Sequence, residues 1–408
     1  MKNKNQHRDS CDYLIIGAGI IGLAIAKALH EKEPGSDILI IEKEDEVGAH
    51  GSGRNSGVLH AGFYYTANSL KARFAREGNA RMTAFCKDNN LPINPSGKVV
   101  VAKEKDDLPT LEELKKRGDK NGVELHVIDE KELAEKEPMA FTFKKALFAP
   151  TTATVEPKRV CEFLADELKH KGVRFHLGDG FAKKLEVNTI VTSKKHIIKA
   201  GKIINAAGLY ADKVARQFGF GRSYTIIPFK GIYLKDKNVG DIPVKRNIYP
   251  VPNIKNPFLG VHFTTAVDGH VKLGPTAIPG FWRESYKGMK NFKPVEMATI
   301  LSWEALLFMT NAFGFRKLAF EEMKKYNRKT YLKMAEPLVK DNAILQKLTQ
   351  WTTPGIRAQL LNKKTKELVQ DFVVESDQDS IHILNAVSPA YTAAFPFGEY
   401  VVEEYVFK

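Results

Sequence analysis

A glycine-rich turn between an apolar strand and a helix is the feature that most limits how this chain can fold. Residues 12–16 are typical of a buried strand and lead directly into Gly17-Ala18-Gly19-Ile20-Ile21-Gly22, a G-x-G-x-x-G pattern. The first glycine of this pattern permits a tight turn, the second lets the backbone approach a pyrophosphate, and the third lets the helix pack closely. The pattern therefore predicts a Rossmann-like βαβ unit with a diphosphate at the helix N-terminus.

The residues after this turn complete the nucleotide-binding pattern. Leu23, Ala24 and Ala28 recur with helical spacing, and residues 36–41 are typical of a second strand. Glu42 follows that strand, about 20 residues after the last glycine, where an acidic side chain holds a ribose hydroxyl. A coincidental glycine-rich turn is the alternative, but the complete context favours a dinucleotide site.

The next segment indicates which dinucleotide is bound. A nicotinamide-binding domain continues into another helix–strand unit, whereas residues 48–65 of this chain read GAHGSGRNSGVLHAGFYY. A backbone with so many glycines and small side chains can lie against a large planar ligand and its phosphates. An ordinary surface loop is the alternative, but together with the glycine pattern the loop favours the second half of a flavin dinucleotide site.

Several further motifs give the chain a specific resemblance. They are HGSGRNSGVLHAGFYY from His50, GKVVVA from Gly97, NAAGLYAD from Asn205, PFKG from Pro228, IYPVP from Ile248, FLGVHFT from Phe258, KLGPTA from Lys272, GIRAQ from Gly355 and NAVSPAYTA from Asn385. Through these motifs the chain resembles the D-amino-acid-oxidase-like superfamily of FAD enzymes, in particular its L-2-hydroxyglutarate oxidase/dehydrogenase branch. The resemblance implies FAD as cofactor and oxidation of a small 2-hydroxy acid.

We expect a mixed α/β fold with two domains, since 408 residues of which 43% are hydrophobic can bury more than one core. The predicted FAD-binding domain is Rossmann-like and discontinuous, with residues 11–90, 150–220 and 353–408. A β-rich substrate domain, residues 91–149 and 221–352, is inserted into it. Helices are predicted over residues 69–89, 108–120 and 155–171, and strands over residues 98–102, 173–177 and 201–205.

The resemblance assigns a set of residues to the FAD site. The cofactor-binding candidates are Gly17, Ala18, Gly19, Ile20, Ile21, Gly22, Glu42, Lys43, Ser52, Asn55, Ser56, Gly57, Ala206, Ala207, Gly208, Arg357, Ser388, Pro389 and Ala390. From composition alone, a small-residue packing turn is an equal interpretation of residues 206–208.

Residues 385–390 are expected to begin the last helix, with its N–H groups stabilising the reduced flavin. Pro396 would then interrupt hydrogen bonding to Thr392 within that helix. We expect FAD to be bound non-covalently, because His50 precedes the flavin loop and Cys86 lies on the apolar side of a helix.

Basic and aromatic residues in the motifs are candidates for binding the substrate. Arg357 offers a rigid fork that matches a carboxylate, and an internal ion pair is the equal alternative. Lys230 is a second cation, less fork-like than the arginine usual in the family. The predicted substrate-binding residues are Lys230, Arg357, Arg54, Tyr65 and Tyr391. Arg54, Thr276, Lys230 and Tyr391 depart from the residues common in the family, which leaves the substrate open.

Two histidines, His60 and His262, are candidate catalytic bases because both lie between apolar residues in the resembling motifs. Either can take the hydroxyl proton of an alcohol substrate as its hydride leaves for flavin N5. A structural role is the alternative for each. We favour His60, because its loop is expected to face the isoalloxazine.

Composition limits the compartment and the partners. Cys11, Cys86 and Cys161 lie far apart and predict reduced, mostly buried thiols without a metal site. The N-terminus lacks an apolar secretory region, and no stretch approaches the roughly 20 apolar residues of a membrane span, so we expect a cytoplasmic protein. Scattered, solvated lysines best explain the net charge of +14, with weak adhesion to anionic lipids as the second interpretation.

The leading prediction is an FAD-dependent oxidoreductase that converts a small 2-hydroxy acid, most specifically L-2-hydroxyglutarate, to the 2-oxo acid. An FAD-dependent amine or amino-acid oxidase is the alternative. A flavin-bearing protein associated with nucleic acid is less favoured, because no RNA-binding motif accompanies the basic residues.

The motifs do not reveal the electron acceptor, which we expect to be a membrane quinone or oxygen. Residues 300–309, ILSWEALLFM, are apolar beside basic residues, which is typical of a helix at a membrane interface. A helix packed against its own sheet shows the same pattern. The resembling branch has bacterial members linked to membrane quinones, and this favours peripheral contact with the inner membrane.

Overall fold

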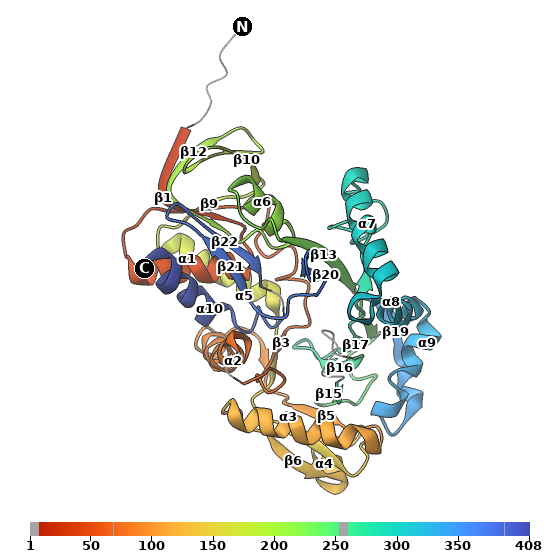
Figure 1. Cartoon of the computed structure of the whole chain (residues 1–408). Coiled ribbons are helices and arrows are strands. Elements are labelled where there is room, and N and C mark those ends of the chain that lie inside the picture. Colours follow the sequence, from red (N-terminus) through yellow and green to blue (C-terminus); the bar gives the residue numbers. More distant parts are fainter. Residues whose placement is uncertain (1–7, 68, 253–259, 387) are drawn as a thin grey trace. The chain divides into compact units, whose positions relative to one another are not determined.

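The computed structural model describes residues 8–67, 69–252, 260–386 and 388–408 (Figure 1). The chain forms two compact units, each made of separate stretches. Unit 1 contains the chain up to Arg54, Pro157–Ile226 and Ala358–Lys408, and unit 2 contains Asn55–Glu156 and Ile227–Arg357.

This division differs from the expected one at residues 55–90, 150–156 and 353–357, which lie in unit 2, and at residues 221–226, which lie in unit 1. At residues 55–90 and 150–156 the difference arises from non-local hydrogen bonds. Strand β3 (Val58–Leu59) pairs with β8 (Ala153–Val155), and the Asn121 side chain donates to the backbone carbonyls of Gly62 and Tyr65.

Unit 1 is built on an eight-stranded sheet with a parallel centre. Its strands are β1 (Arg8–Ile16), β2 (Ile38–Ile41), β9 (Arg174–His176), β10 (Phe181–Glu186), β11 (Thr189–Thr192), β12 (Ile197–Asn205), β21 (Val373–Ser376) and β22 (Ser380–Asn385). Parallel pairs join β9, β2, β1, β12 and β22 in that order. Strands β10, β11 and β21 are attached by antiparallel pairs.

The helices of unit 1 are α1 (Ile20–Lys32), α5 (Pro157–His170), α6 (Ala211–Gln217), α10 (Ala394–Val401), the short η2 (Gly208–Tyr210) and the π-helix η7 (Val402–Val406). Helix α1 follows the glycine turn as predicted, and Pro157 occupies the first position of α5, where its missing N–H costs no hydrogen bond. Helix α10 packs closely on α1, because a Cβ on Gly398 would lie 2.8 Å from the Ala24 backbone.

The last helix begins later than the sequence predicts. Asn385 is held in β22 by its pairing with Val373, and its side chain donates to the Asp371 carbonyl. Ser388 and Pro389 lie in a bend, and α10 starts only at Ala394, so the expected helix N-terminus at residues 385–390 is wrong. Pro396 lies in the first turn of α10, where its missing N–H interrupts no intrahelical bond.

Unit 2 is built on an antiparallel sheet with one parallel pair, β15–β5. Its strands, in spatial order, are β19 (Leu348–Trp351), β14 (Leu234–Asp236), β17 (Val271–Gly274), β16 (His262–Thr265), β15 (Asn247–Pro250), β5 (Lys98–Val101), β7 (Lys145–Ala149) and β6 (His126–Asp129). Two smaller sheets have the orders β3–β8–β4 (Ile93–Asn94) and β18 (Ile278–Pro279)–β13 (Tyr224–Gly231)–β20 (Gly355–Asn362).

The helices of unit 2 are α2 (Leu70–Asp88), α3 (Leu108–Lys120), α4 (Glu130–Lys136), α7 (Pro294–Thr310), α8 (Phe315–Met323) and α9 (Arg328–Lys333), with the short η1 (Lys105–Asp107), η3 (Ala312–Gly314), η4 (Lys324–Tyr326), η5 (Glu336–Leu338) and η6 (Asn342–Lys347). Ser69 caps α2 by accepting from the Ala72 N–H. The helices predicted over residues 69–89 and 108–120 are confirmed to within one residue.

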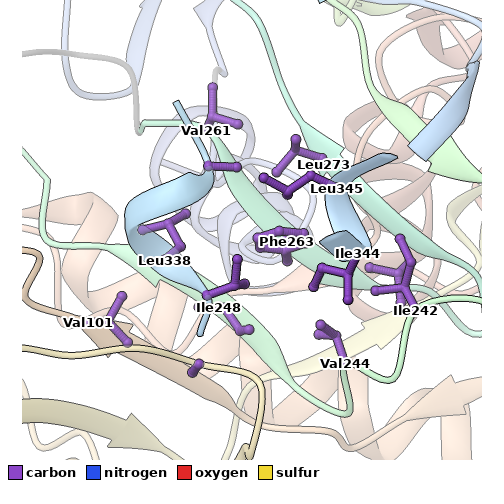
Figure 2. Packing of buried hydrophobic residues seen from close by; sticks show 14 of the residues in the cluster. Val101, Ile242, Val244, Ile248, Val261, Phe263, Leu273, Leu338, Ile344 and Leu345 are labelled. Atoms are coloured by element: carbon purple, nitrogen blue, oxygen red, sulfur yellow. The ribbon is translucent and has the colours of Figure 1, made fainter. Parts of the chain in front are cut away.

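The two faces of the large sheet in unit 2 differ in character. One face carries a core in which Ile248, Phe263 and Leu273 of neighbouring strands pack with Leu338 and Leu345 (Figure 2). Because side chains alternate along a strand, the positions next to these core residues point to the opposite face. Over β16 and β17 that opposite face carries the polar side chains of His262, Thr264 and Lys272, whereas over β5, β7 and β15 it carries a second apolar core that includes Val100, Leu147 and Tyr249.

Two further predictions concern cysteines and membrane spans. Cys11, Cys86 and Cys161 are free and buried, and burial raises the pKa of each thiol to about 12. The prediction of buried, unpaired thiols is therefore confirmed. Within the described part of the chain, no helix has both the length and the apolar character needed to cross a bilayer.

Candidate active site

The glycine turn of unit 1 has the geometry that its sequence predicts. Gly17 has a φ of +111°, and a Cβ at this position would lie 2.7 Å from the Ala206 carbonyl oxygen. A Cβ on Gly22 would lie 2.0 Å from the Gly17 carbonyl oxygen. Neither position therefore accepts a side chain. Gly19 is the N-cap residue of α1, so the free N–H groups of the first helical turn begin directly after it.

Two side chains already bond to the backbone of this turn. Ser52 Oγ accepts from the Ile20 N–H at 2.9 Å, and one Glu42 carboxylate oxygen accepts from the Ala18 N–H at 2.8 Å. The second Glu42 oxygen accepts from the Glu44 N–H at 3.0 Å. The bare turn, the helix N-terminus and these polar groups fit the diphosphate and ribose of a dinucleotide.

The small residues at 206–208 lie beside the glycine turn. They follow β12, and the Asn205 side chain accepts from the Ala207 N–H and donates to the Ala211 carbonyl. The Ala206 carbonyl is the nearest backbone group to Gly17. Small side chains here let two backbone segments cross at contact distance.

Other predicted cofactor residues are divided between the units. Lys43 contacts His50 Nε2 at 2.8 Å and lies 5.7 Å from the centroid of the Tyr210 ring. Ser388, Pro389 and Ala390 belong to unit 1, and Asn55, Ser56, Gly57 and Arg357 belong to unit 2. Their contacts with FAD stay a prediction.

The polar face of the large sheet in unit 2 holds the second predicted histidine. The rings of His262 (β16) and Tyr249 (β15) stack with their centroids 3.7 Å apart. Burial lowers the pKa of His262 to about 3, so the imidazole is neutral. Its Nδ1 lies 2.8 Å from the Gly260 carbonyl. Nδ1 therefore donates the proton in this hydrogen bond, and Nε2 keeps its lone pair.

His60 lies near His262, and the two imidazoles, together with Lys98 and Arg357, which act on both, are called the cluster below. The pKa of His60 is held well below the usual range, first by burial and then by repulsion from Lys98, from His262 whenever that imidazole is protonated, and from Arg357. The structure therefore brings together the two predicted bases and the predicted carboxylate-binding arginine. Both imidazoles are neutral, and a neutral imidazole is the form that accepts a proton.

Arg357 lies near the start of β20 and is partly buried. Burial lowers its pKa, against the opposing influence of Tyr233, Tyr65 and Glu322. Glu322 already forms a buried ion pair with Lys325 and accepts from the Ala277 N–H at 2.5 Å. Glu322 is therefore already engaged by Lys325 and by a backbone N–H.

Tyr65 also belongs to the cluster, as predicted. Burial raises the pKa of its hydroxyl, and Arg357 opposes that rise. The hydroxyl is therefore neutral and available as a hydrogen-bond donor.

Sequence reasoning missed several members of this cluster, notably Lys98, Tyr64, Tyr233 and Tyr249. Tyr233 is fully enclosed, and burial raises its pKa to about 12. Lys98 lies within the buried run KVVV of β5. A charged side chain inside a predicted buried strand was the signal that would have found it.

The other predicted substrate-binding residues lie elsewhere. The Lys230 side chain is half-buried, and its backbone carbonyl accepts from Thr276 Oγ1 at 2.9 Å. Arg54 and Tyr391 belong to unit 1. Arg54 Nε donates to the Ala49 carbonyl at 2.7 Å, and the Tyr391 hydroxyl donates to the Pro157 carbonyl at 3.0 Å. Their roles in binding substrate stay predictions.

Unit 1 also contains a group of side chains with metal-binding chemistry. His176, Asp179 and His196 each place a ligand atom within 4.8 Å of the others. Asp179 accepts from Ser193 Oγ, the Lys194 N–H and His196 Nδ1 at 2.8 to 3.1 Å. These bonds give Asp179 a structural role in fixing the turns after β9 and β11.

The fold and the site together define a class of protein. A glycine turn that fits a dinucleotide, and a buried set of basic, aromatic and imidazole side chains in a second unit, are the parts of a dinucleotide-dependent oxidoreductase. Comparison with known families identifies the dinucleotide. Residues 12–403 match the family described as FAD dependent oxidoreductase, DAO, and the chain belongs to this family. The predicted enzyme class and cofactor are thereby confirmed.

Relatives of known activity match over nearly their whole length. The L-2-hydroxyglutarate dehydrogenase of Indibacter alkaliphilus is 38% identical over 400 residues, which cover 96% of this chain and 97% of that protein. The mitochondrial L-2-hydroxyglutarate dehydrogenase of Mus musculus is 33% identical over 411 residues, which cover 95% and 87%.

Solved structures confirm the fold class. The reduced, FAD-bound L-alpha-glycerophosphate oxidase of Mycoplasma pneumoniae superposes with a TM-score of 0.74 at 20% identity. The match covers 97% of this chain and 95% of that one.

Proposed function

We propose that this protein oxidises L-2-hydroxyglutarate to 2-oxoglutarate. The observation that carries the proposal is the grouping of the two basic side chains Arg357 and Lys98 with two neutral histidines in one cluster. A dicarboxylate substrate is the kind of ligand that pairs with such basic groups. The names and full-length coverage of the relatives support the same substrate.

Arg357 is the residue best suited to hold a substrate carboxylate. Its guanidinium offers two parallel N–H donors, which match a carboxylate in a bidentate pair. The partly buried position strengthens such a pair, since fewer water molecules compete for the donors. Lys230, at the end of β13, is the proposed second cation, and burial lowers its pKa.

His60 is the proposed base for the substrate hydroxyl. Bound FAD supplies the hydride acceptor. Because burial and the neighbouring basic side chains keep His60 neutral, it is ready to accept the hydroxyl proton. An incoming carboxylate offsets those charges and raises the basicity of the imidazole when substrate is present. His262, with Nδ1 turned to the Gly260 carbonyl, presents Nε2 as a second acceptor.

The substrate is tested by anaerobic reduction of the flavin. Mixing the yellow holoprotein with L-2-hydroxyglutarate is expected to bleach the flavin absorbance, and the D-enantiomer at equal concentration is the matched control. An unchanged spectrum with L-2-hydroxyglutarate, together with bleaching by another hydroxy acid, would exclude this substrate. Bleaching by L-amino acids alone would instead favour the amine-oxidase alternative.

We also propose that helices α7 and α8 contact a membrane surface, where a quinone is the electron acceptor. Helix α7 buries Ile300 and Leu307 but leaves other large apolar side chains in solvent. The exposed apolar residues of this region are Val295, Leu301, Phe308, Met309, Phe313, Phe320 and Met323. Exposed apolar side chains beside cations are typical of an interfacial helix.

Arg316 adds a cation to this apolar surface. Its guanidinium donates to the Phe308 and Met309 carbonyls at 2.7 Å and lies 5.7 Å from the Phe308 ring centroid. An arginine held beside an exposed aromatic ring can pair with a lipid phosphate while the ring enters the head-group region.

Flotation with vesicles tests this membrane contact. We expect the protein to float with anionic liposomes at low salt. The double substitution Met309→Ser/Phe320→Ser is expected to reduce the bound fraction several-fold, because it removes exposed apolar area that would enter the membrane. Val187→Ser is the matched control, since Val187 is 62% exposed and lies in unit 1. If wild-type protein stays at the bottom of the gradient at low salt, oxygen or a soluble acceptor becomes the better proposal.

A further inference from the structure

Lys98 is the most unusual buried charge in unit 2. The side chain is fully buried, and no group in the described part of the chain accepts a hydrogen bond from its Nζ. Instead, Nζ lies 4.9 Å from the ring centroid of Phe63 and 4.7 Å from those of Tyr64 and Tyr249. Three ring faces therefore hold an ammonium group that has no carboxylate partner.

The aromatic rings around this ammonium also lie next to the two histidines, in space or in the sequence. Tyr249, which contacts Lys98, stacks on His262. Phe63 and Tyr64 follow His60 closely in the flavin loop. The aromatic side chains thus link the position of Lys98 to both imidazoles, and Lys98 is one of the charges that act on each of them.

We propose that Lys98 is a positioning residue whose ring-held ammonium keeps His60 and His262 unprotonated, so that His60 is available as the base. This inference rests on the proposed function in one respect, the assignment of His60 as base. Lys98 does not touch the substrate in this proposal, because its Nζ is sealed from solvent. It acts only through the charge that it places beside the imidazoles.

Lys98 carries its positive charge in the pH range in which this role needs it. Burial lowers the pKa of Lys98 to about 7, so the side chain becomes charged as the pH falls below neutrality. That is the range in which an ordinary histidine would gain its proton. The first proton taken up by the cluster therefore goes to Lys98, and its charge opposes a second proton on either histidine.

Other charged groups act on the same histidines and must stay constant in any test. His60 also responds to His262 and Arg357, whereas His262 responds to Arg357 and Lys325 and is favoured in its charged form by the Gly260 carbonyl. Burial is the largest cause of the lowered pKa of both imidazoles. Removing Lys98 is therefore expected to reverse only part of the lowering of the two histidine pKa values.

The experiment is a histidine titration by NMR, carried out on the FAD-loaded protein without substrate. In Lys98→Met, which keeps the side-chain length and removes the charge, the His60 titration midpoint is expected to rise by about 1 pH unit. Lys98→Arg keeps the charge and should retain the wild-type midpoint. The acid limb of the pH profile for flavin reduction should move by the same amount. An unchanged midpoint in a folded Lys98→Met protein would overturn the proposal.

Thermal unfolding gives a second readout that needs no substrate. Lys98 binds its proton up to pH 10.5 when unfolded but only below about pH 7 when folded, so its burial costs stability fully below pH 7 and progressively less up to pH 10.5. Lys98→Met is therefore expected to melt above wild type at pH 6, with the difference shrinking towards pH 10. A constant difference would contradict the assigned titration.

The wild-type protein keeps the proposal testable even if Lys98→Met does not fold. Its His60 and His262 signals are then expected to shift with a midpoint near pH 7, which reports the titration of the neighbouring Lys98. Flat signals through pH 7 would overturn the proposal. Since neither NMR nor melting uses substrate, failure of L-2-hydroxyglutarate to reduce the flavin would reject the proposed function without affecting these outcomes.

Discussion

Replacing His60 with glutamine is expected to slow flavin reduction by L-2-hydroxyglutarate about 10²- to 10⁴-fold, the usual contribution of a general base. Substrate affinity should change little, because Arg357 rather than His60 is proposed to hold the carboxylate. Anaerobic stopped-flow measurement separates the two effects, since the limiting rate reports the chemical step and its concentration dependence reports binding. In wild type the rate should stay flat through the usual histidine titration range near pH 6.5, because the low pKa of His60 keeps the base neutral there.

His262→Gln is the comparison that assigns the base. His262 is tied to the Gly260 carbonyl and stacked on Tyr249, so we expect its replacement to have a smaller effect of about tenfold. A wild-type reduction rate in His60→Gln would remove His60 from the chemistry. If His262→Gln then lost most activity, His262 would be the base. If both variants kept full activity with L-2-hydroxyglutarate, neither histidine would be the base.

The local features of the nucleotide unit could be predicted from the sequence because they depend on neighbouring residues. The turn at Gly17, the helix α1 and the strand β2 lie in one short segment, and glycine spacing and apolar periodicity encode them directly. Pro157 at the start of α5 was predictable for the same reason, since proline is favoured at the first helical position.

The cluster in unit 2 was only partly predictable, because it depends on strand register. His60, His262 and Arg357 were found through motifs, whereas Lys98 and Tyr249 acquire their role only when β5 pairs with β15 and β15 with β16. The first of these pairings joins segments that lie about 150 residues apart in the sequence, as the hydrogen bond between Asn247 and Gly97 shows directly. Periodicity predicts which face a residue occupies but not which strand lies beside it.

The final helix shows how a local pattern can mislead. Small residues and Ser388-Pro389 resemble a helix start, yet the strand pairing of Asn385 with Val373 continues to the edge of this segment. The chain then needs the turn at residues 390–393 before α10 can begin. Tertiary pairing outweighed a local propensity that is worth far less than a ladder of hydrogen bonds and buried side chains.

Arg357 is expected to control substrate affinity. Replacing it with methionine should weaken binding of L-2-hydroxyglutarate about 10²- to 10³-fold, because two charge-assisted hydrogen bonds to one carboxylate are lost in a partly buried site. Arg357→Lys should recover only part of this loss, since a point charge does not reproduce the bidentate fork. Titration of the oxidised flavin spectrum with the product 2-oxoglutarate measures the affinity without turnover.

A matched control separates this local effect from the general positive charge of the protein. Arg159→Met removes one charge from an exposed arginine of α5 and should leave the affinity unchanged at physiological ionic strength.

A comparison with Lys230 tests which cation of unit 2 makes the main contact with the carboxylate. If Arg357→Met bound 2-oxoglutarate like wild type while Lys230→Met lost affinity, the main carboxylate contact would belong to Lys230, and the partly buried charge of Arg357 would have to be balanced by the tyrosines Tyr65 and Tyr233 and by Glu322.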